Sequence, residues 1–357
     1  MESRFRLSVV ALLVTAPSLL FAAETLVFAV DIIRHGDRTP ILHLPKVDYQ
    51  WKEGPGQLTA EGMQQEFQLG SELRKKYVDA THLLPEHYEY GTIYVRSTDY
   101  ERTLMSAQSF LMGLYPLGTG PKTTDSSSPA LPKGFQPIPI FSAPSKSDEV
   151  IVQTVSREDR AKLMTEYVFS LPEWQQKNNE LKSKYPLWSK QTGIEIENLD
   201  DLQMVGDTLY IHQLHKAPMP EEMSVSDIET IISNSKWAFM AEERPKEVAR
   251  AYSSKIMANI ANYLKKGSKN TSKLKYVLLS GHDTTIAGVM SFMGTPLENA
   301  PHYASNLNFS LYESGANNYL VKLTYNGKPV SIPACGGTVC ELHQFLEYVE
   351  SSKVSVA

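Results

Sequence analysis

The segment from Arg34 to Pro40 reads R-H-G-D-R-T-P and places two guanidinium groups around an imidazole. A phosphoryl group in transfer spreads negative charge over three oxygens, and planar, permanently charged arginine side chains match that charge. We therefore expect Arg34, Arg38 and the later Arg96 to clamp a phosphate. His35, neutral at its attacking nitrogen, is the expected nucleophile.

A second polar pair, His282 and Asp283, lies far along the chain. A histidine nucleophile needs an acid that protonates the departing alkoxide, and a carboxyl group that is protonated at low pH can do so. We assign this role to Asp283 and expect His282 to donate to the phosphoryl oxygens, beside the start of a helix. Gly36 is expected to let the backbone pass close to the phosphate.

The elements that must position these residues are strands that end where the polar residues begin. Apolar, β-branched runs cover residues 25–33, 92–95 and 276–279, and helical patterns cover 59–77 and 248–263. Strands that alternate with helices indicate an α/β fold with a mostly parallel sheet. Ligands of such sheets bind beyond the carboxyl ends of the strands, which is where all the candidate residues fall.

The stretch 156–240 is charged and helix-like and lacks a long strand pattern. We interpret it as a helical cap domain inserted into a three-layer α/β/α core formed by residues 24–155 and 241–357. Residues 306–312 and 319–325 are expected to form an antiparallel hairpin at the sheet edge.

The N-terminus has the features of a secretory signal peptide. Arg4 and Arg6 precede the apolar run 7–21, and Ala23 is the expected cleavage position of a leader covering residues 1–23. The run is short for a bilayer span, so no stable membrane anchor is expected. The protein is predicted to be periplasmic or secreted, or lumenal in a eukaryote.

Two cysteines, Cys335 and Cys340, lie five residues apart. In an oxidising compartment they are expected to form a disulfide bond, with two free thiols as the alternative. The formal net charge of −5 becomes −6 once the leader is removed, which argues against nonspecific nucleic-acid binding.

Several other polar residues have competing interpretations. His212 and His215 could share one helix face, but no other ligand lies at a fitting spacing, so a metal site is not favoured. Asp31 is interpreted as a hydrogen-bonded strand residue, and Asp37 as a solvated loop residue rather than one that tunes the nucleophile. The aromatic residues of the helical stretch are expected to be core anchors: Trp174, Trp188 and Trp237.

The motif R-H-G-x-R-x-P with a late H-D resembles the histidine acid phosphatase family. The similarity extends to G-Q-L-T-A-E-G (56–62), R-S-T-D-Y-E-R-T (96–103) and S-G-H-D-T-T (280–285), so it covers most of the chain. The resemblance implies a phosphohistidine intermediate and no metal or other cofactor. It assigns phosphate clamp, nucleophile and acid to Arg34, His35, Arg38, Arg96, His282 and Asp283.

The H-D-T-T sequence resembles the lysosomal and prostatic type rather than phytases, which favours general phosphomonoesters as substrates and inorganic phosphate as product. The segment 206–215 is also similar to that type, although His212 stands where a glutamate is usual. A narrower phytase-like or lysophosphatidate-type specificity stays open. A phosphomutase and a non-catalytic phosphoryl-binding protein are the weaker alternatives, and a homodimer is an open question.

Overall fold

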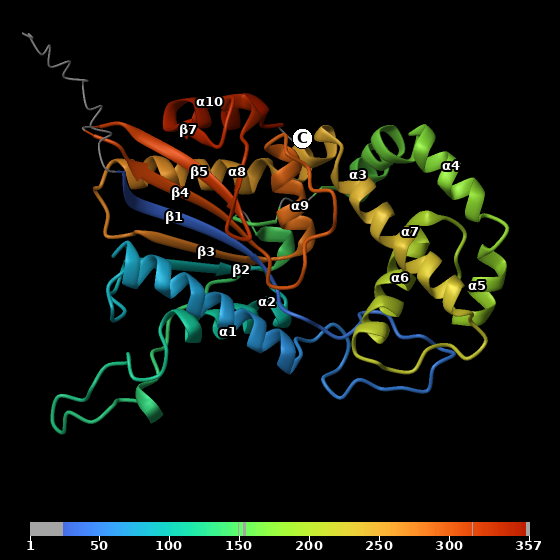
Figure 1. The fold of residues 1–357 in the computed structure, drawn as a ribbon, viewed down its shortest axis with the longest axis horizontal. Helices are drawn as coiled ribbons and strands as arrows, with labels where there is room; N and C mark the ends of the chain where they lie inside the picture. The colour runs from blue at the N-terminus through green and yellow to red at the C-terminus, as the bar shows by residue number, and fades with distance from the viewer. Residues whose placement is uncertain (1–23, 149, 153–154, 316, 355–357) are drawn as a thin grey trace, which may run out of the picture.

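The computed structural model describes residues 24–148, 150–152, 155–315 and 317–354. The predicted signal peptide, residues 1–23, lies outside the described residues. The chain forms a mixed β-sheet with helices on both faces, and a second group of helices lies beside it (Figure 1).

Three parallel strands form the half of the sheet that carries the candidate residues. They are β1 (Thr25–Arg34), β2 (Ile93–Ser97) and β3 (Tyr276–Gly281), in the spatial order β2-β3-β1. All three predicted strands are therefore present, and their carboxyl ends lie at one edge, as expected for an α/β fold.

Antiparallel strands extend the sheet on the other side of β1. β4 (Asn306–Glu313) pairs with β1, and β5 (Tyr319–Tyr325) pairs with β4. The predicted hairpin is thus confirmed, but it is not the sheet edge, because β6 (Lys328–Val330) and β7 (Val339–Glu341) both pair with β5.

Strand β1 is buried on both faces, which explains its continuous apolar sequence. Side chains alternate across a strand, so Phe28, Val30 and Ile32 enter one apolar cluster while Ala29 and Ile33 enter the other. A central strand of this kind cannot slip in register without moving polar groups into the two cores.

Helices cover both of these faces and complete the predicted three layers (Figure 1). One face is covered by α1 (Ala60–Arg74) and α2 (Glu101–Leu114). The other is covered by α8 (Lys246–Ser268), α9 (Asp283–Phe292) and α10 (Leu342–Ser352). Shorter helical turns are η1 (Lys75–Ala80), η2 (Pro132–Gly134), η3 (Ser145–Ser147), η4 (Thr165–Phe169) and η5 (Pro333–Cys335).

The second group of helices lies beyond the carboxyl edge of the parallel strands (Figure 1). We call it the helical region. It comprises α3 (Arg157–Met164), α4 (Pro172–Leu181), α5 (Tyr185–Thr192), α6 (Leu199–Leu214) and α7 (Val225–Glu243).

The helical region has an apolar core of its own. Trp174 and Trp188 are buried in it and Trp237 packs against it, so the predicted role of these aromatic residues as core anchors is confirmed. Leu44 and Val47, from the loop after β1, also belong to this core. The sequence had not suggested that this loop crosses from the sheet to the helices.

Cys335 and Cys340 form a disulfide bond, as predicted. Cys340 lies in β7 opposite Val321 of β5, so the bond ties the turn after η5 to the sheet. Its small loop has little effect on the entropy of the unfolded chain, and its effect is local.

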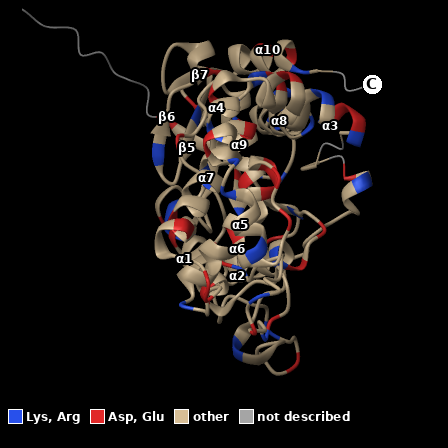
Figure 2. Cartoon of the chain, turned by 90° about the vertical axis from the view of Figure 1, so that its right-hand side faces the viewer, with Lys and Arg blue, Asp and Glu red and all other residues tan. Residues whose placement is uncertain are grey.

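Basic and acidic residues are interspersed over the face that includes the helical region (Figure 2). Within the described part of the chain, none of the helices combines the length and the apolar character that a bilayer span requires.

Candidate active site

The pairing of β1 with β3 brings the two polar motifs together. Arg34 is the register partner of Gly281, and the backbone N–H of His35 donates to the Gly281 carbonyl at 3.1 Å. The next residue after Gly281 is His282, the N-cap of α9. The rings of His35 and His282 lie 5.6 Å apart, centroid to centroid, although 247 positions separate them in the sequence.

Arg34 links the nucleophile segment to the candidate acid. Its Nη2 lies 2.7 Å from Oδ2 of Asp283, and its guanidinium stacks over the Tyr303 ring at 4.3 Å. Nη1 donates to the Pro301 carbonyl. The side chain of Asp283 stays 24% exposed, so a ligand can reach it.

The backbone beside His35 determines which ring nitrogen can attack. Nδ1 lies 2.8 Å from the Gly36 carbonyl, which can only accept, so Nδ1 carries the proton and Nε2 keeps its lone pair. Gly36 also has a reason other than the expected one. A Cβ there would lie 2.3 Å from the carbonyl oxygen of Gly62, so glycine is required where the loop passes α1.

Arg38 is held by the helical region. Its Nη2 lies 3.2 and 3.0 Å from the two carboxylate oxygens of Asp207, which belongs to α6. Asp207 is 169 positions from Arg38, and its local sequence does not mark it as a partner. Arg38 and His35 line the same cavity.

Arg96 does not join this cluster, in contrast to the expectation from the sequence. It lies on β2, where Val95 and Ser97 are buried on one face and Arg96 points to the other. Its Nη2 is 3.4 Å from Oδ1 of the buried Asp148, and it is not among the residues that line the cavity with His35.

Arg102 takes the position that Arg96 was expected to occupy. It lies in the first turn of α2, lines the cavity, and places Nη2 3.4 Å from Nδ1 of His282. Nε2 of His282 lies 3.0 Å from Oγ1 of Thr98. The motif R-S-T-D-Y-E-R-T contains both arginines. Arg96 belongs to the strand and Arg102 follows the start of the helix, and this difference is the signal in the sequence that distinguishes them.

Burial and the charges of neighbouring residues keep both histidines neutral. Burial first, and then the charges of Arg34, His282 and Arg38, hold the pKa of His35 well below its ordinary value. Burial and the charge of Arg102 lower the pKa of His282 to about 3, although Asp283 opposes this shift. His35 therefore remains an uncharged nucleophile at acidic pH.

Asp283 experiences opposing effects. Burial acts to raise its pKa, but the charges of Arg34, Arg38 and His282 and a hydrogen bond from the Thr284 amide lower it overall. This carboxyl group is thus ionised and paired with Arg34. It can donate a proton only when something offsets the surrounding positive charge.

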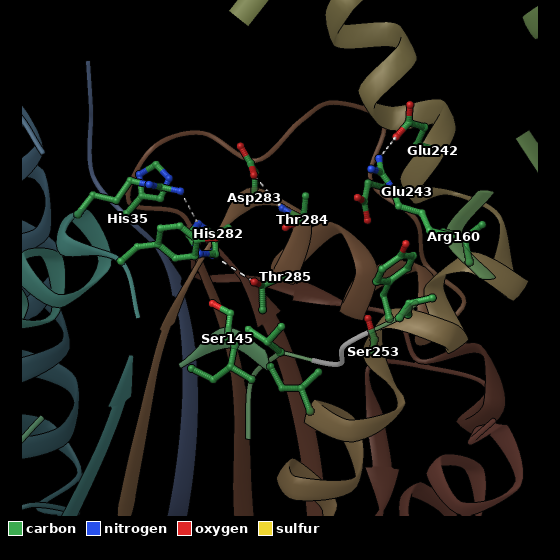
Figure 3. A pocket seen from close by; sticks show the side chains of 18 of the residues that line it. His35, Ser145, Arg160, Glu242, Glu243, Ser253, His282, Asp283, Thr284 and Thr285 are labelled. Carbon is green, nitrogen blue, oxygen red and sulfur yellow. Dashed lines mark hydrogen bonds and ion pairs between the residues drawn. The ribbon is translucent and has the colours of Figure 1, made fainter. Parts of the chain in front are cut away.

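These residues form the inner end of a cavity of about 590 Å³ (Figure 3). His35, His282 and Asp283 lie at this end. Glu242, Glu243 and Arg160, from α7 and α3, lie at the opposite end, which we call the outer end. Apolar side chains also line the cavity: Ile151, Val152, Val155, Met164, Val248 and Ile256.

Asp37 is buried, which differs from the expected solvated loop position. Its Oδ2 accepts from Thr59 Oγ1 at 2.5 Å and lies 2.8 Å from Nε2 of His215, so it fixes the loop against α1 and α6. His212 points elsewhere, with Nδ1 donating to the Pro218 carbonyl at 2.7 Å. The two histidines therefore have separate partners.

Asp31 is buried and hydrogen-bonded, as the sequence suggested. It accepts from the Tyr77 hydroxyl at 2.6 Å and from Asn306 Nδ2 at 2.7 Å. These bonds join η1, the helical turn that follows α1, to the strands β1 and β4.

In sequence, the chain is similar to lysosomal and prostatic acid phosphatases. The chain is 31% identical to lysosomal acid phosphatase of Xenopus laevis over 361 residues, which cover 95% of this chain and 80% of that protein. It is 29% identical to prostatic acid phosphatase of Homo sapiens over 341 residues, covering 92% and 85%.

Solved phytase structures share the fold. The phytase of Klebsiella sp. ASR1 superposes with a TM-score of 0.66 at 16% identity, covering 93% of this chain and 97% of that one. The phytase of Citrobacter braakii gives a TM-score of 0.65 at 16% identity, covering 92% and 98%.

The sequence profile of the histidine phosphatase superfamily (branch 2) matches residues 41–326, which is most of the chain. This match begins just after the R-H-G-D-R-T-P segment, so the two observations are separate. Together with the acid phosphatase relatives and the shared fold, they lead to one conclusion: the chain belongs to branch 2 of the histidine phosphatase superfamily.

Proposed function

We propose that this chain is an acid phosphatase that hydrolyses small phosphomonoesters to an alcohol and inorganic phosphate. The observation that carries the proposal is the β1–β3 register, which sets His35 beside His282 and Arg34 within 2.7 Å of Asp283. The similarity to lysosomal and prostatic acid phosphatases supports the same activity.

In the first step, Nε2 of His35 forms a bond to phosphorus as the ester P–O bond breaks. Asp283 gives its proton to the departing alkoxide oxygen. Arg34, Arg38 and Arg102 bind the equatorial oxygens, with Arg102 in the role first expected of Arg96. His282 takes the tautomer with its proton on Nδ1, which donates to a phosphoryl oxygen in place of the Arg102 contact, while Nε2 accepts from the Thr98 hydroxyl.

In the second step, water attacks the phosphorus of the phosphohistidine. The Asp283 carboxylate takes a proton from that water, the P–N bond breaks, and its electron pair returns to Nε2 of His35. Inorganic phosphate leaves and Asp283 is protonated again, as the next cycle requires.

This cycle predicts that phosphatase activity is highest at acidic pH. A phosphate anion between the arginines offsets the positive charge that otherwise lowers the pKa of Asp283. Binding and low pH thus both favour the protonated acid, whereas His35 stays neutral because its own pKa is lowered.

Hydrolysis of p-nitrophenyl phosphate at pH 5 tests the proposal. We expect His35→Ala to lower kcat on the order of 10⁴-fold or more, since removal of a nucleophile disables the whole mechanism. His343→Ala, at an exposed position in α10, is the matched control and should retain activity. A radiolabelled, acid-labile phosphoenzyme should form in the wild type and be absent from His35→Ala.

Full hydrolysis by His35→Ala would refute the nucleophile assignment. Absence of any phosphatase activity in the folded wild type, with phosphate binding retained, would instead favour the non-catalytic alternative.

We also propose that the protein is exported. The N-terminal leader sequence and the disulfide between Cys335 and Cys340 support this location, because such bonds persist in oxidising compartments.

A further inference from the structure

The outer end of the cavity differs in charge from the phosphate end. Glu242 and Glu243 are the last two residues of α7, and both line the cavity that contains His35. Figure 3 shows Glu243 between Asp283 and the Glu242–Arg160 pair. A leaving group attached to a phosphate at His35 can extend toward these residues, because they line the same cavity.

The carboxyl group of Glu243 has no ion-pair partner within the described part of the chain, although the charge of Arg160 acts on it. Arg160, the nearest basic residue of α3, is 3.9 Å from Glu242 and is itself 57% exposed. Arg244 turns away from the cavity and donates to the Glu298 carbonyl at 2.8 Å. No hydrogen bond or ion pair to the Glu243 carboxyl group occurs among the described residues.

Glu243 lies at the carboxyl end of a helix, and this position also favours a cation beside it. The carboxyl end of a helix carries partial negative charge, and the last turn of α7 contains no lysine or arginine. Burial and the charges of Glu242 and Asp283 raise the pKa of Glu243 well above its ordinary value, although the charge of Arg160 opposes this shift. The pocket therefore disfavours the ionised carboxyl group, which a ligand ammonium would stabilise.

The separation of the two ends sets the length of a suitable leaving group. A Cβ built on Gly288 would lie 3.6 Å from Oε2 of Glu243, and Gly288 follows Asp283 by five residues on α9. Five residues of helix span about 7.5 Å. The lining of the same cavity includes Ile151, Val152 and Ile256, which suit an aliphatic linker.

We propose that the leaving-group subsite, with Glu243 as its specificity-determining residue, selects phosphomonoesters of short amino alcohols. This inference rests on the proposed phosphatase activity. The ester phosphate lies at His35, a short aliphatic chain contacts the apolar wall, and the ammonium group donates to Glu243. Inositol polyphosphates, whose additional phosphates would face Glu242 and Glu243, are disfavoured.

The test compares two substrates of similar shape, O-phosphoethanolamine and n-propyl phosphate, which differ by an ammonium in place of a methyl group. A charge-assisted hydrogen bond contributes about 1.5–3 kcal/mol, so kcat/KM should favour O-phosphoethanolamine by about tenfold or more. In Glu243→Gln this ratio should fall to within about threefold of unity. In Glu243→Asp it should be partly retained.

Glu61→Gln is the control, because Glu61 is an exposed carboxylate that does not line the cavity. It should keep the wild-type ratio. Equal kcat/KM for the two substrates in the wild type, an equal ratio in wild type and Glu243→Gln, or a preference for phytate would each overturn the subsite. Failure of the wild type to release phosphate from both substrates and from p-nitrophenyl phosphate would instead refute the proposed function.

Discussion

The two ends of the cavity are built in different ways. At the inner end, the charged groups have specific partners: Arg34 contacts Asp283, Arg38 contacts Asp207, and Arg102 contacts His282. At the outer end, Arg160 approaches Glu242 only at 3.9 Å, and Glu243 has no ion-pair partner among the described residues.

The difference shows which part of the site is prepared before a substrate arrives. The inner end is positioned by two neighbouring strands and two helix starts, so it presents the same groups to any phosphate. The outer end is formed by the helical region, so its charge is available to discriminate between leaving groups. The proposed mechanism and the proposed subsite thus assign chemistry and specificity to different structural units.

Replacement of the candidate acid at the inner end should have the largest effect on kcat. We expect Asp283→Ala to lower kcat on n-propyl phosphate on the order of 10³-fold, because a poor leaving group needs the proton. The loss on p-nitrophenyl phosphate should be on the order of tenfold, since p-nitrophenolate leaves readily. His343→Ala, at an exposed position in α10 outside the cavity, is the control and should not show this dependence on the leaving group. Equal losses on both substrates would contradict the role of Asp283.

Replacing each arginine of the R-S-T-D-Y-E-R-T motif in turn tests which of the two acts at the inner end of the cavity. Arg102→Ala should lower kcat/KM for p-nitrophenyl phosphate on the order of 10²-fold, because a preorganised donor to the phosphoryl oxygens is lost. Arg96→Ala breaks the pair with Asp148 outside the cavity, so its effect should appear in the free energy of unfolding, with a smaller loss of kcat/KM. Steady-state kinetics and urea unfolding of both variants measure these effects, and the reverse order would restore Arg96 to the clamp.

The smallest expected effect is a loss of folding stability at acidic pH that originates from His282 at the inner end. The pKa of His282 is lowered to about 3 in the folded protein, so between pH 6.5 and 3 the unfolded chain binds a proton that the folded chain does not. The free energy of unfolding should therefore fall as the pH drops through this range, by roughly 2 kcal/mol at pH 4.5 from this residue. His282→Gln should remove that part of the pH dependence.

Urea unfolding at pH 6.5 and pH 4.5 provides the measurement, with His343→Gln as the control at an exposed histidine. If His282→Gln and His343→Gln lost the same stability between the two pH values, the lowered pKa of His282 would be contradicted.

Much of the fold and half of the site could be read from local patterns. The strands β1, β2 and β3 were predictable because a strand buried on both faces needs a continuous apolar run. His35, Arg34, Asp283 and His282 followed from such strands ending in polar residues, since parallel strands present their carboxyl ends at one edge. The disulfide between Cys335 and Cys340 was predictable from short spacing and an export signal.

The remaining features depended on contacts between distant segments. Arg96 and Arg102 are both near the end of β2, but side-chain direction on a strand and in the first turn of a helix sends them to different places. Asp207 reaches Arg38 across 169 positions, and Gly36 is needed because α1 passes beside it.

The amino-acid sequence by itself determined the chemical groups, the parallel strands that carry them and the family to which they belong, because these depend on residue types at short spacing. Only the tertiary structure decided which arginine faces the phosphate position and that Glu243 lies at the other end of the same cavity. The physical reason is that charge recognition depends on distance in space, and the packing of the helical region against the sheet sets that distance.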